Sequence, residues 1–138
     1  MTRHYGFTGT QIGATPIQIE RILTLLEEED VTHLHHGDCI GADAQAHAAA
    51  QSLGVKVILH PPTVTTKRAW CKNAVEVRRA FPYLERNHHI VDASTTLIAT
   101  PSGPEELRSG TWATIRYARR MKTRCLVITP DGKVIETP

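Results

Sequence analysis

Hydrophobic and polar positions follow two different periods along most of the chain, and this pattern predicts strands that alternate with helices. Short apolar runs such as Val55–Leu59 have the length of buried strands. Between these runs, apolar residues recur three and four positions apart. Ile19, Ile22 and Leu26, for example, would share one face of a helix. The alternation of the two periods indicates an α/β protein with a parallel sheet and helices on both faces.

The predicted elements can be placed along the sequence from these periods and from the turn residues between them. Strands are expected at residues 4–8, 31–36, 55–59, 95–100 and 124–129, with a short sixth strand at 133–136 that pairs back after a Pro-Asp-Gly turn. Helices are expected from Thr15 to the acidic run at 27–30, from the turn at 37–43 to Leu53, over 83–93 and over 111–121. The prediction is therefore a three-layer sandwich with a mostly parallel central sheet of about five strands plus a short C-terminal strand.

Helix boundary signals support two of these assignments. Thr15 precedes Pro16 and is followed three residues later by Gln18, which is the pattern of a capping box with proline at the first helical position. Gly54 follows the alanine-rich segment and is expected to cap its C-terminus. The acidic run at 27–30 has the wrong charge for a helix C-terminus and suggests only a solvated end.

Residues 63–82 are the least regular part of the sequence. The segment carries five basic residues and one acidic residue. A structureless loop of this length is improbable in a compact domain, so part of the segment, about 66–80, is predicted to be helical. Its basic residues are expected to form a solvated face, a lid over an anionic ligand, or a strand-binding patch with Trp70 as a stacking platform.

Composition limits the class of protein. The chain has 138 residues, enough for one domain with a hydrophobic core, and we expect a single domain over 1–138. Its formal net charge is +2, so binding to nucleic acid would require a local basic patch. Three separated cysteines without a C-x-x-C pair indicate free thiols in a reducing compartment. With no signal-peptide pattern and no long apolar run, the expected location is the cytoplasm.

The candidate chemistry lies where the predicted strands end. In parallel α/β sheets, ligands bind outside the carboxyl ends of the strands. Those ends are followed here by residues 8–13, 36–43, 60–62 and 100–111. The last of them ends in Ser109-Gly110-Thr111 directly before a predicted helix. Free first-turn N–H groups and the helix dipole favour a phosphate at such a place, although Ser109 could also be a plain N-cap.

Several motifs resemble those of the SLOG superfamily, which includes the DNA-processing DprA proteins, the YspA-like proteins and the LOG phosphoribohydrolases. The run from His36 to Asp43, followed by Ala46 and His47, is similar to the glycine-rich second loop of the superfamily. Gly6–Thr10 resembles the first loop. The order of these elements along residues 4–128 is more specific than any one of them.

Two further motifs complete the resemblance. Arg86-Asn87 looks like the family's Arg-Asn element, and Ser109-Gly110-Thr111, with Thr114 behind it, looks like the terminal phosphate loop. The YspA-like proteins are the group most similar to this sequence, partly because Trp70 lies ahead of Arg-Asn. The resemblance implies a Rossmann-like fold that binds a nucleotide or a nucleotide-derived ligand.

The ligand residues are expected on these loops, with Arg86 suited to a bidentate phosphate contact. The expected ligand- and phosphate-binding residues are Gly9, Thr10, His36, Gly37, Asp38, Gly41, Ala42, Asp43, His60, Arg86, Asn87, Pro101, Ser109, Gly110, Thr111 and Trp112. Alternative interpretations remain open for several of them. Gly37 and Gly41 could only form a tight turn, Asp43 could pair with His47 one turn on, and Trp112 could pack in the core.

Catalysis is left open by the sequence. LOG enzymes use a Pro-Gly-Gly-x-Gly-Thr-x-x-Glu motif, and Thr114 stands where that motif has its acidic residue. An oxocarbenium-like transition state requires a nearby carboxylate, which threonine does not supply. Asp38, Asp43, Glu105 and Glu106 are the candidates to replace it. The eight histidines show no metal-binding spacing, so we predict neither a metal nor a cofactor.

Three functions follow from this reading. The first is a sensor or carrier that binds a nucleotide-type small molecule. The second is a hydrolase of the N-glycosidic bond of nucleoside monophosphates. The third, favoured least because of the low net charge, is DprA-like binding of single-stranded DNA. A homodimer or higher homo-oligomer is expected by analogy with other Rossmann-like domains, and no membrane partner is expected.

Overall fold

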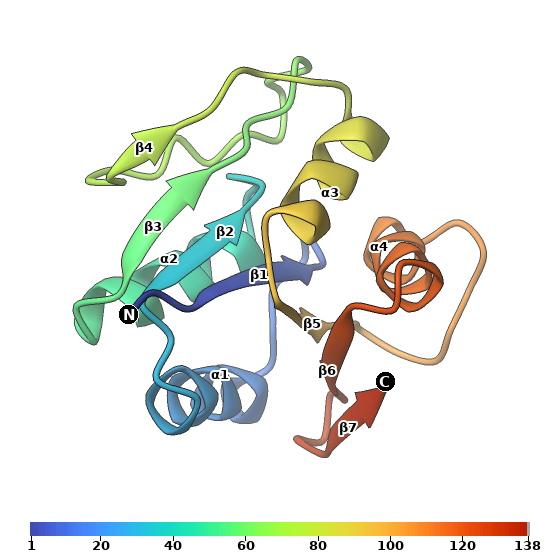
Figure 1. The fold of residues 1–138 in the computed structure, drawn as a ribbon. Helices are drawn as coiled ribbons and strands as arrows, with labels where there is room; N and C mark the ends of the chain where they lie inside the picture. Colours follow the sequence, from blue (N-terminus) through green and yellow to red (C-terminus); the bar gives the residue numbers. More distant parts are fainter. Residues whose placement is uncertain (138) are drawn as a thin grey trace.

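A seven-stranded sheet runs through the molecule, with helices packed on both faces (Figure 1). The computed structural model describes residues 1–137; Pro138, the last residue of the predicted domain, lies outside the described residues. The strands are β1 (His4–Gly9), β2 (His33–His36), β3 (Lys56–Leu59), β4 (Glu76–Val77), β5 (Thr96–Thr100), β6 (Arg124–Ile128) and β7 (Val134–Thr137). The helices are α1 (Pro16–Glu28), α2 (Ala42–Ser52), α3 (Tyr83–Asp92) and α4 (Gly110–Arg120).

The order of strands across the sheet is β4-β3-β2-β1-β5-β6-β7. All neighbours are parallel except β6 and β7, which pair antiparallel. The chain moves outward from β1 to β4 and then returns to β5 on the other side of β1. The order therefore reverses between β1 and β5, which is where α/β sheets of this type hold their ligands. The predicted α/β sandwich and the antiparallel C-terminal strand are confirmed.

The two faces of the sheet carry separate hydrophobic clusters. On one face α1 and α2 cover a core that includes Phe7, Leu34 and Leu59. On the other face α3 and α4 bury a smaller cluster that includes Ile90 and Ile115. Small alanine side chains in α2 let that helix lie close to the strands. Each strand is thus fixed from both sides, and the loops at its carboxyl end are held in place.

The predicted helix caps form. The hydroxyl oxygen of Thr15 accepts a hydrogen bond from the N–H of Gln18, and the side-chain oxygen of Gln18 accepts one from the N–H of Thr15. Gly54 follows Leu53, the C-cap residue of α2, and has φ at +73°, a conformation that glycine adopts without strain. The acidic end of α1 also has a structural explanation, because Glu29 accepts hydrogen bonds from Tyr5 and Arg124.

The predicted helix at 66–80 is wrong. Residues 63–82 run as an extended, irregular segment whose only regular part is the two-residue strand β4. Its backbone is satisfied by remote groups: the N–H of Ala69 donates to the carbonyl of Asp38, and the N–H of Val75 donates to that of Val57. Because these partners already satisfy the peptide groups, the segment needs no internal helical hydrogen bonds.

Two composition-based expectations can be compared with the structure. Cys39, Cys71 and Cys125 are all free thiols within residues 1–137, as the spacing predicted. Over the same residues, every helix is too short or too polar to cross a membrane.

Candidate functional site

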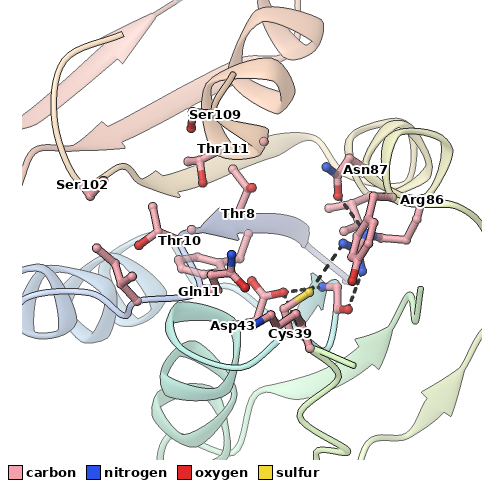
Figure 2. Close-up of a pocket in the computed structure, with 18 of the residues that line it drawn as sticks. Thr8, Thr10, Gln11, Cys39, Asp43, Arg86, Asn87, Ser102, Ser109 and Thr111 are labelled. Carbon is pink, nitrogen blue, oxygen red and sulfur yellow. Dashed lines mark hydrogen bonds between the residues drawn. The ribbon is translucent and has the colours of Figure 1, made fainter. Parts of the chain in front are cut away.

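A cavity of about 550 Å³ opens at the carboxyl edge of the sheet, where the strand order reverses (Figure 2). Its walls come from the end of β1, the loop after β2, one residue of the irregular segment, α3, the loop after β5 and the first turn of α4. The lining residues are Phe7, Thr8, Gly9, Thr10, Gln11, Ile12, Gly37, Cys39, Asp43, Lys67, Tyr83, Leu84, Arg86, Asn87, Ile90, Ser102, Glu106, Arg108, Ser109, Gly110 and Thr111.

The first turn of α4 presents unpaired donors to this cavity. Ser109 is the N-cap, and its hydroxyl accepts a hydrogen bond from the N–H of Trp112. The N–H groups of Gly110 and Thr111, which also line the cavity, have no acceptor within residues 1–137. The N-cap interpretation of Ser109 is confirmed. A capped helix start still leaves two amides without a partner, so phosphate binding at this turn stays a prediction.

The turn after β1 forms the opposite wall and adds hydroxyl groups. The carbonyl of Thr10 accepts the N–H groups of Gly13 and Ala42, which fixes the turn against the start of α2. In Figure 2 the side chains of Thr8 and Thr10 lie across from that of Thr111. The cavity is therefore bordered by hydroxyls on both sides of the switch point.

The N–H groups of the glycine-rich loop after β2 are already bonded to a carboxylate of the chain. The Oδ2 atom of Asp43 accepts the N–H groups of Gly37 and Cys39, each at 3.2 Å. The glycines are needed for packing within the chain. A Cβ on Gly37 would lie 2.5 Å from the guanidinium of Arg86, and Gly41 has φ at +84° with its Cβ position 2.3 Å from the carbonyl oxygen of Gln11. This loop therefore supports the cavity, whereas the helix start of α4 remains open to a phosphate.

Asp43 is a buried carboxyl that lines the cavity. Burial raises its pKa to about 6, although the Arg86 guanidinium and the two loop N–H groups act in the opposite direction. The pairing of Asp43 with His47 that the sequence left open does not form, because His47 is bonded to His36 and to the carbonyl of Lys72. Asp43 instead contributes a carboxyl that is partly protonated near neutral pH.

Replacing Asp43 by asparagine tests this assignment. The pKa of Asp43 is higher in the folded state than in the unfolded state. Its contribution to the free energy of unfolding is therefore most favourable below about pH 4 and is lost as the pH rises through about 6. The amide oxygen of Asp43→Asn can accept the same two N–H groups without a charge. We expect the variant to be more stable than the wild type by about 1–3 kcal/mol at pH 7.5, with a smaller difference at pH 5.5. Urea unfolding at both pH values measures it; a variant less stable at pH 7.5 would contradict the assignment.

Arg86 joins two strand ends. Its guanidinium is 5% exposed, and its Nη1 donates to the carbonyls of Gly37 and His60. Its Nε donates to the Asn87 side chain, and its Nη2 faces the sulfur of Cys39 at 3.7 Å. Of the five N–H groups, one is left at most. The bidentate phosphate contact expected for Arg86 is therefore not available in this arrangement.

Asp38 points away from the cavity. Its carboxylate is fully buried and accepts hydrogen bonds from the Nε of Arg68 and the N–H of Cys71. It therefore fixes the irregular basic segment to the loop after β2. This placement leaves Asp43 and Glu106 as the two candidate catalytic carboxylates that line the cavity.

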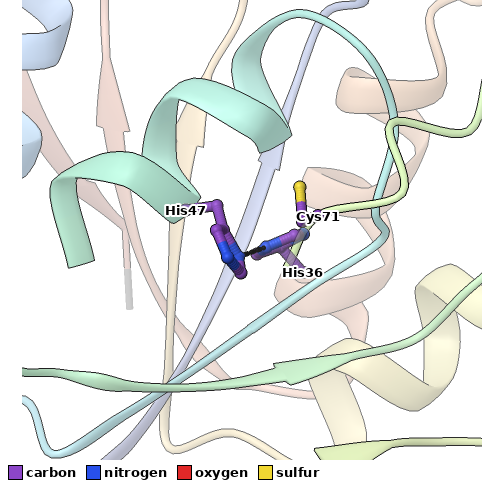
Figure 3. A group of neighbouring side chains, drawn as sticks. All are labelled: His36, His47 and Cys71. Carbon is purple, nitrogen blue, oxygen red and sulfur yellow. Dashed lines mark hydrogen bonds between the residues drawn. The ribbon is translucent and has the colours of Figure 1, made fainter. Parts of the chain in front are cut away.

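His36 also lies outside the cavity, in a cluster with His47 and Cys71 whose ligand atoms are within 4.8 Å of one another (Figure 3). The N–H of Asp38 donates to Nδ1 of His36, so the ring proton of His36 is on Nε2 and is donated to Nδ1 of His47. His47 in turn donates to the carbonyl of Lys72. Burial and a hydrogen bond to Asp38 raise the pKa of Cys71 to about 12. Every ring nitrogen has a partner in the chain, so this arrangement favours a structural role over a metal.

The remaining predicted residues are divided among other places. His60 lines a second, smaller cavity, and Pro101 and Trp112 line an apolar hollow beside β6 and β7, where the indole N–H donates to the carbonyl of Gly103. Gly41 and Ala42 lie beneath the turn after β1.

The cavity also includes residues that sequence reasoning missed. Thr8 and Gln11 flank predicted positions and could have been found from the predicted end of β1. Ser102 lies in the predicted strand-end loop 100–111, and Lys67 lies in the basic segment that the sequence allows as a lid, but the sequence singles out neither. Tyr83 and Leu84 carry no local signal that points to a site.

Comparisons with known proteins show what this fold resembles. No protein-family model and no curated protein matches the sequence. Among solved structures, the molybdenum cofactor binding protein of Rippkaea orientalis superimposes with a TM-score of 0.73 at 19% identity, over 94% of this chain and 77% of that one. DNA processing protein A of Helicobacter pylori, described with its mode of binding single-stranded DNA, gives 0.63 at 18% identity, over 91% of this chain and 64% of that one.

A third structure extends the likeness. DNA processing protein A of Streptococcus pneumoniae gives a TM-score of 0.64 at 16% identity, over 91% of this chain and 50% of that one. Identities this low show the fold alone. The predicted resemblance is thereby confirmed at the level of the fold, while the YspA-like group remains a prediction. The chain shares the Rossmann-like α/β fold of these cofactor-binding and DNA-processing proteins.

Proposed function

We propose that the large cavity binds a nucleotide or a nucleotide-derived phosphorylated ligand, as a sensor or carrier would. The observation that carries the proposal is the pair of unpaired N–H groups on Gly110 and Thr111, which open onto the cavity at a helix N-terminus. They provide two aligned donors and the positive end of a helix dipole at one point of the wall. A phosphate group is the ligand chemistry that this arrangement favours.

The rest of the cavity suits the other parts of a nucleotide. Its volume is within the range of small-molecule sites. Phe7, Tyr83 and Ile90 offer apolar surface for a base or a ribose, and Thr8 and Thr10 offer hydroxyls for polar edges. Lys67 and Arg108 add positive charge at exposed positions. A lining that combines apolar, hydroxyl and cationic side chains supports the proposal.

A hydrolase of nucleoside monophosphates is a second candidate, favoured by one observation. Asp43 lines the cavity with a pKa raised to about 6, as a general acid for glycosidic bond cleavage would require. Thr114, at the position of the LOG acidic residue, is buried and donates its hydroxyl to the carbonyl of Gly110. A screen for base release with the wild type and with Asp43→Asn tests this candidate. If Asp43→Asn released base at the same rate as the wild type, Asp43 would not be the general acid.

The role of the first-turn N–H groups can be tested by a substitution that removes one of them. Gly110 is the first helical residue, where proline is well tolerated, and Ser109 before it is extended, as a residue preceding proline should be. Gly110→Pro removes one N–H donor while it preserves the helix. We expect it to weaken binding of the best phosphorylated ligand about tenfold, which is the loss of one charge-assisted hydrogen bond.

The matched control is Gly110→Ala. It retains the N–H and adds a methyl group that has no atom within 4 Å, so its affinity is expected to match the wild type. A panel of nucleoside mono- and diphosphates and dinucleotides is first screened by thermal shift, and affinities are then measured by calorimetry. No thermal shift with any of them at millimolar concentration would contradict the proposed function. Equal affinity of the two variants would place the phosphate elsewhere.

A further inference from the structure

A second cavity, of about 300 Å³, lies on the other side of Arg86. Its lining residues are His60, Glu76, Arg78, Arg79, Phe81, Arg86 and His89. Among residues 1–137, Arg86 alone lines both cavities, and its guanidinium is bonded to the carbonyl of His60. The two cavities therefore share a wall and are otherwise built from different parts of the chain.

We propose that this second cavity binds a phosphate group, either as inorganic phosphate or as a small phosphomonoester. Two independent observations point to such a ligand. One is a buried imidazole with an unpaired nitrogen, and the other is an excess of guanidinium groups around it.

The imidazole belongs to His60, which is 3% exposed. Its Nε2 is hydrogen bonded to Nδ1 of His35 at 2.8 Å, whereas its Nδ1 has no partner within residues 1–137. Because the residue lines the cavity, the small exposed part of the ring faces that space. Nδ1 of His60 is not fully enclosed by the chain, so it is a polar atom that a ligand in the cavity can reach and pair with.

Hydrogen bonds across the sheet let His60 act as a donor without becoming charged. Nδ1 of His4 is bonded to Nε2 of His35 at 2.8 Å, and His35 is bonded to His60, so three imidazoles are connected in series. Each neutral ring has one proton and donates one bond. When His4 donates to His35 and His35 donates to His60, the remaining proton is on Nδ1 of His60. An anion in the cavity selects this arrangement because it requires a donor.

The charges around the cavity favour an anion. Arg78 is paired with Glu76, the one carboxylate in the wall, so those two charges offset each other. Arg79 has no carboxylate within ion-pair distance among residues 1–137, and Arg86 is likewise without one. His89 lies 3.8 Å from Glu85 on the same helix. The guanidinium of Arg79 is therefore uncompensated, and its planar geometry matches phosphate oxygens. Arg86 adds positive charge to the same wall but keeps at most one free N–H for a ligand.

The test is a titration of the protein, labelled with ¹⁵N in its histidine rings, with inorganic phosphate and in parallel with glycerol phosphate, against sodium chloride at equal ionic strength. We expect saturable shifts of His60 Nδ1 and of His89, with Nδ1 in its protonated range. If inorganic phosphate binds more tightly, the ligand is free phosphate; if glycerol phosphate binds more tightly, the ligand is a phosphomonoester.

Variants separate a built site from general attraction of anions. Arg79→Gln removes an exposed cation of the cavity, and Arg120→Gln removes an exposed arginine far from it in the sequence. We expect at least about fivefold weaker binding in the first and no change in the second. His60→Gln retains a polar atom near the Nε2 position and lacks Nδ1, and it should weaken binding similarly.

Three results would overturn the proposal: no saturable shift of His60, shifts confined to the amides of Gly110 and Thr111, or equal weakening in Arg79→Gln and Arg120→Gln. Gly110→Pro is expected to leave phosphate binding in the second cavity unchanged. The outcome is therefore independent of the function proposed for the larger cavity.

Discussion

Between pH 7.5 and pH 5.0, the free energy of unfolding of this protein is expected to fall by about 4 kcal/mol or more. The cause is a group of buried neutral histidines. Burial, with the nearby charge of Arg78 acting in the same direction, lowers the pKa of His35 to about 3, and burial likewise lowers that of His60 to about 3. Burial places the pKa of His36 well below its ordinary value as well.

Stability falls at low pH because unfolding is accompanied by proton uptake. The unfolded chain binds protons at these rings below about pH 6.5, and the folded chain does not until about pH 3. The stability is therefore complete above pH 6.5 and is lost as the pH falls. By pH 5, the contributions of His35 and His60 to the free energy of unfolding each fall by about 2 kcal/mol, and the contribution of His36 falls as well. Protonation of Asp43 over the same pH range stabilises the folded state by about 1 kcal/mol and so offsets part of this loss. Because small domains have about 5–15 kcal/mol in total, acid unfolding is expected at about pH 4–5.

Urea unfolding followed by circular dichroism at several pH values from 7.5 to 5.0 measures the effect. Substituting the central ring, His35→Gln, is expected to reduce the slope of stability against pH. The control is His88→Gln, since His88 lies half-exposed against Tyr117 and is expected to leave the slope unchanged. If the wild type took up less than about one proton on unfolding near pH 5, the buried neutral histidines would be contradicted.

Arg86→Leu is expected to destabilise the protein by about 3–5 kcal/mol. The substitution leaves the carbonyls of Gly37 and His60 without a donor at the ends of two adjacent central strands. Each buried carbonyl without a partner costs about 1–3 kcal/mol. The loss of the guanidinium also removes the favourable charge beside Asp43, which raises the pKa of that carboxyl further.

The matched control is Arg78→Leu, which removes an arginine from an exposed ion pair with Glu76. Exposed pairs contribute about 0–1 kcal/mol, so this variant should be close to the wild type. Both are measured by urea unfolding at pH 7.5. If Arg86→Leu were no more harmful than Arg78→Leu, Arg86 would not be the anchor of the two loops, and its guanidinium would be available to a ligand.

The sequence located the candidate site better than it assigned roles within it. It placed the loops at one edge of the sheet and identified Ser109-Gly110-Thr111, because strand ends and helix starts depend on local residues. It did not identify which charged groups face the cavity. Arg86 and Asp38 both lie on the expected loops, yet their side chains are occupied by groups 26 to 49 residues away in the chain. No local pattern encodes such partners.

What the sequence alone determined is the alternation of strands and helices, the capping box at Thr15, the glycine after α2 and the antiparallel return of β7. These features depend on residues within one or two turns of each other, so the local pattern is sufficient. The tertiary structure decided the course of residues 63–82, the neutral state of the buried histidines and the use of the guanidinium of Arg86. Each of these depends on burial and on hydrogen bonds between distant segments, which exist only after the chain has folded.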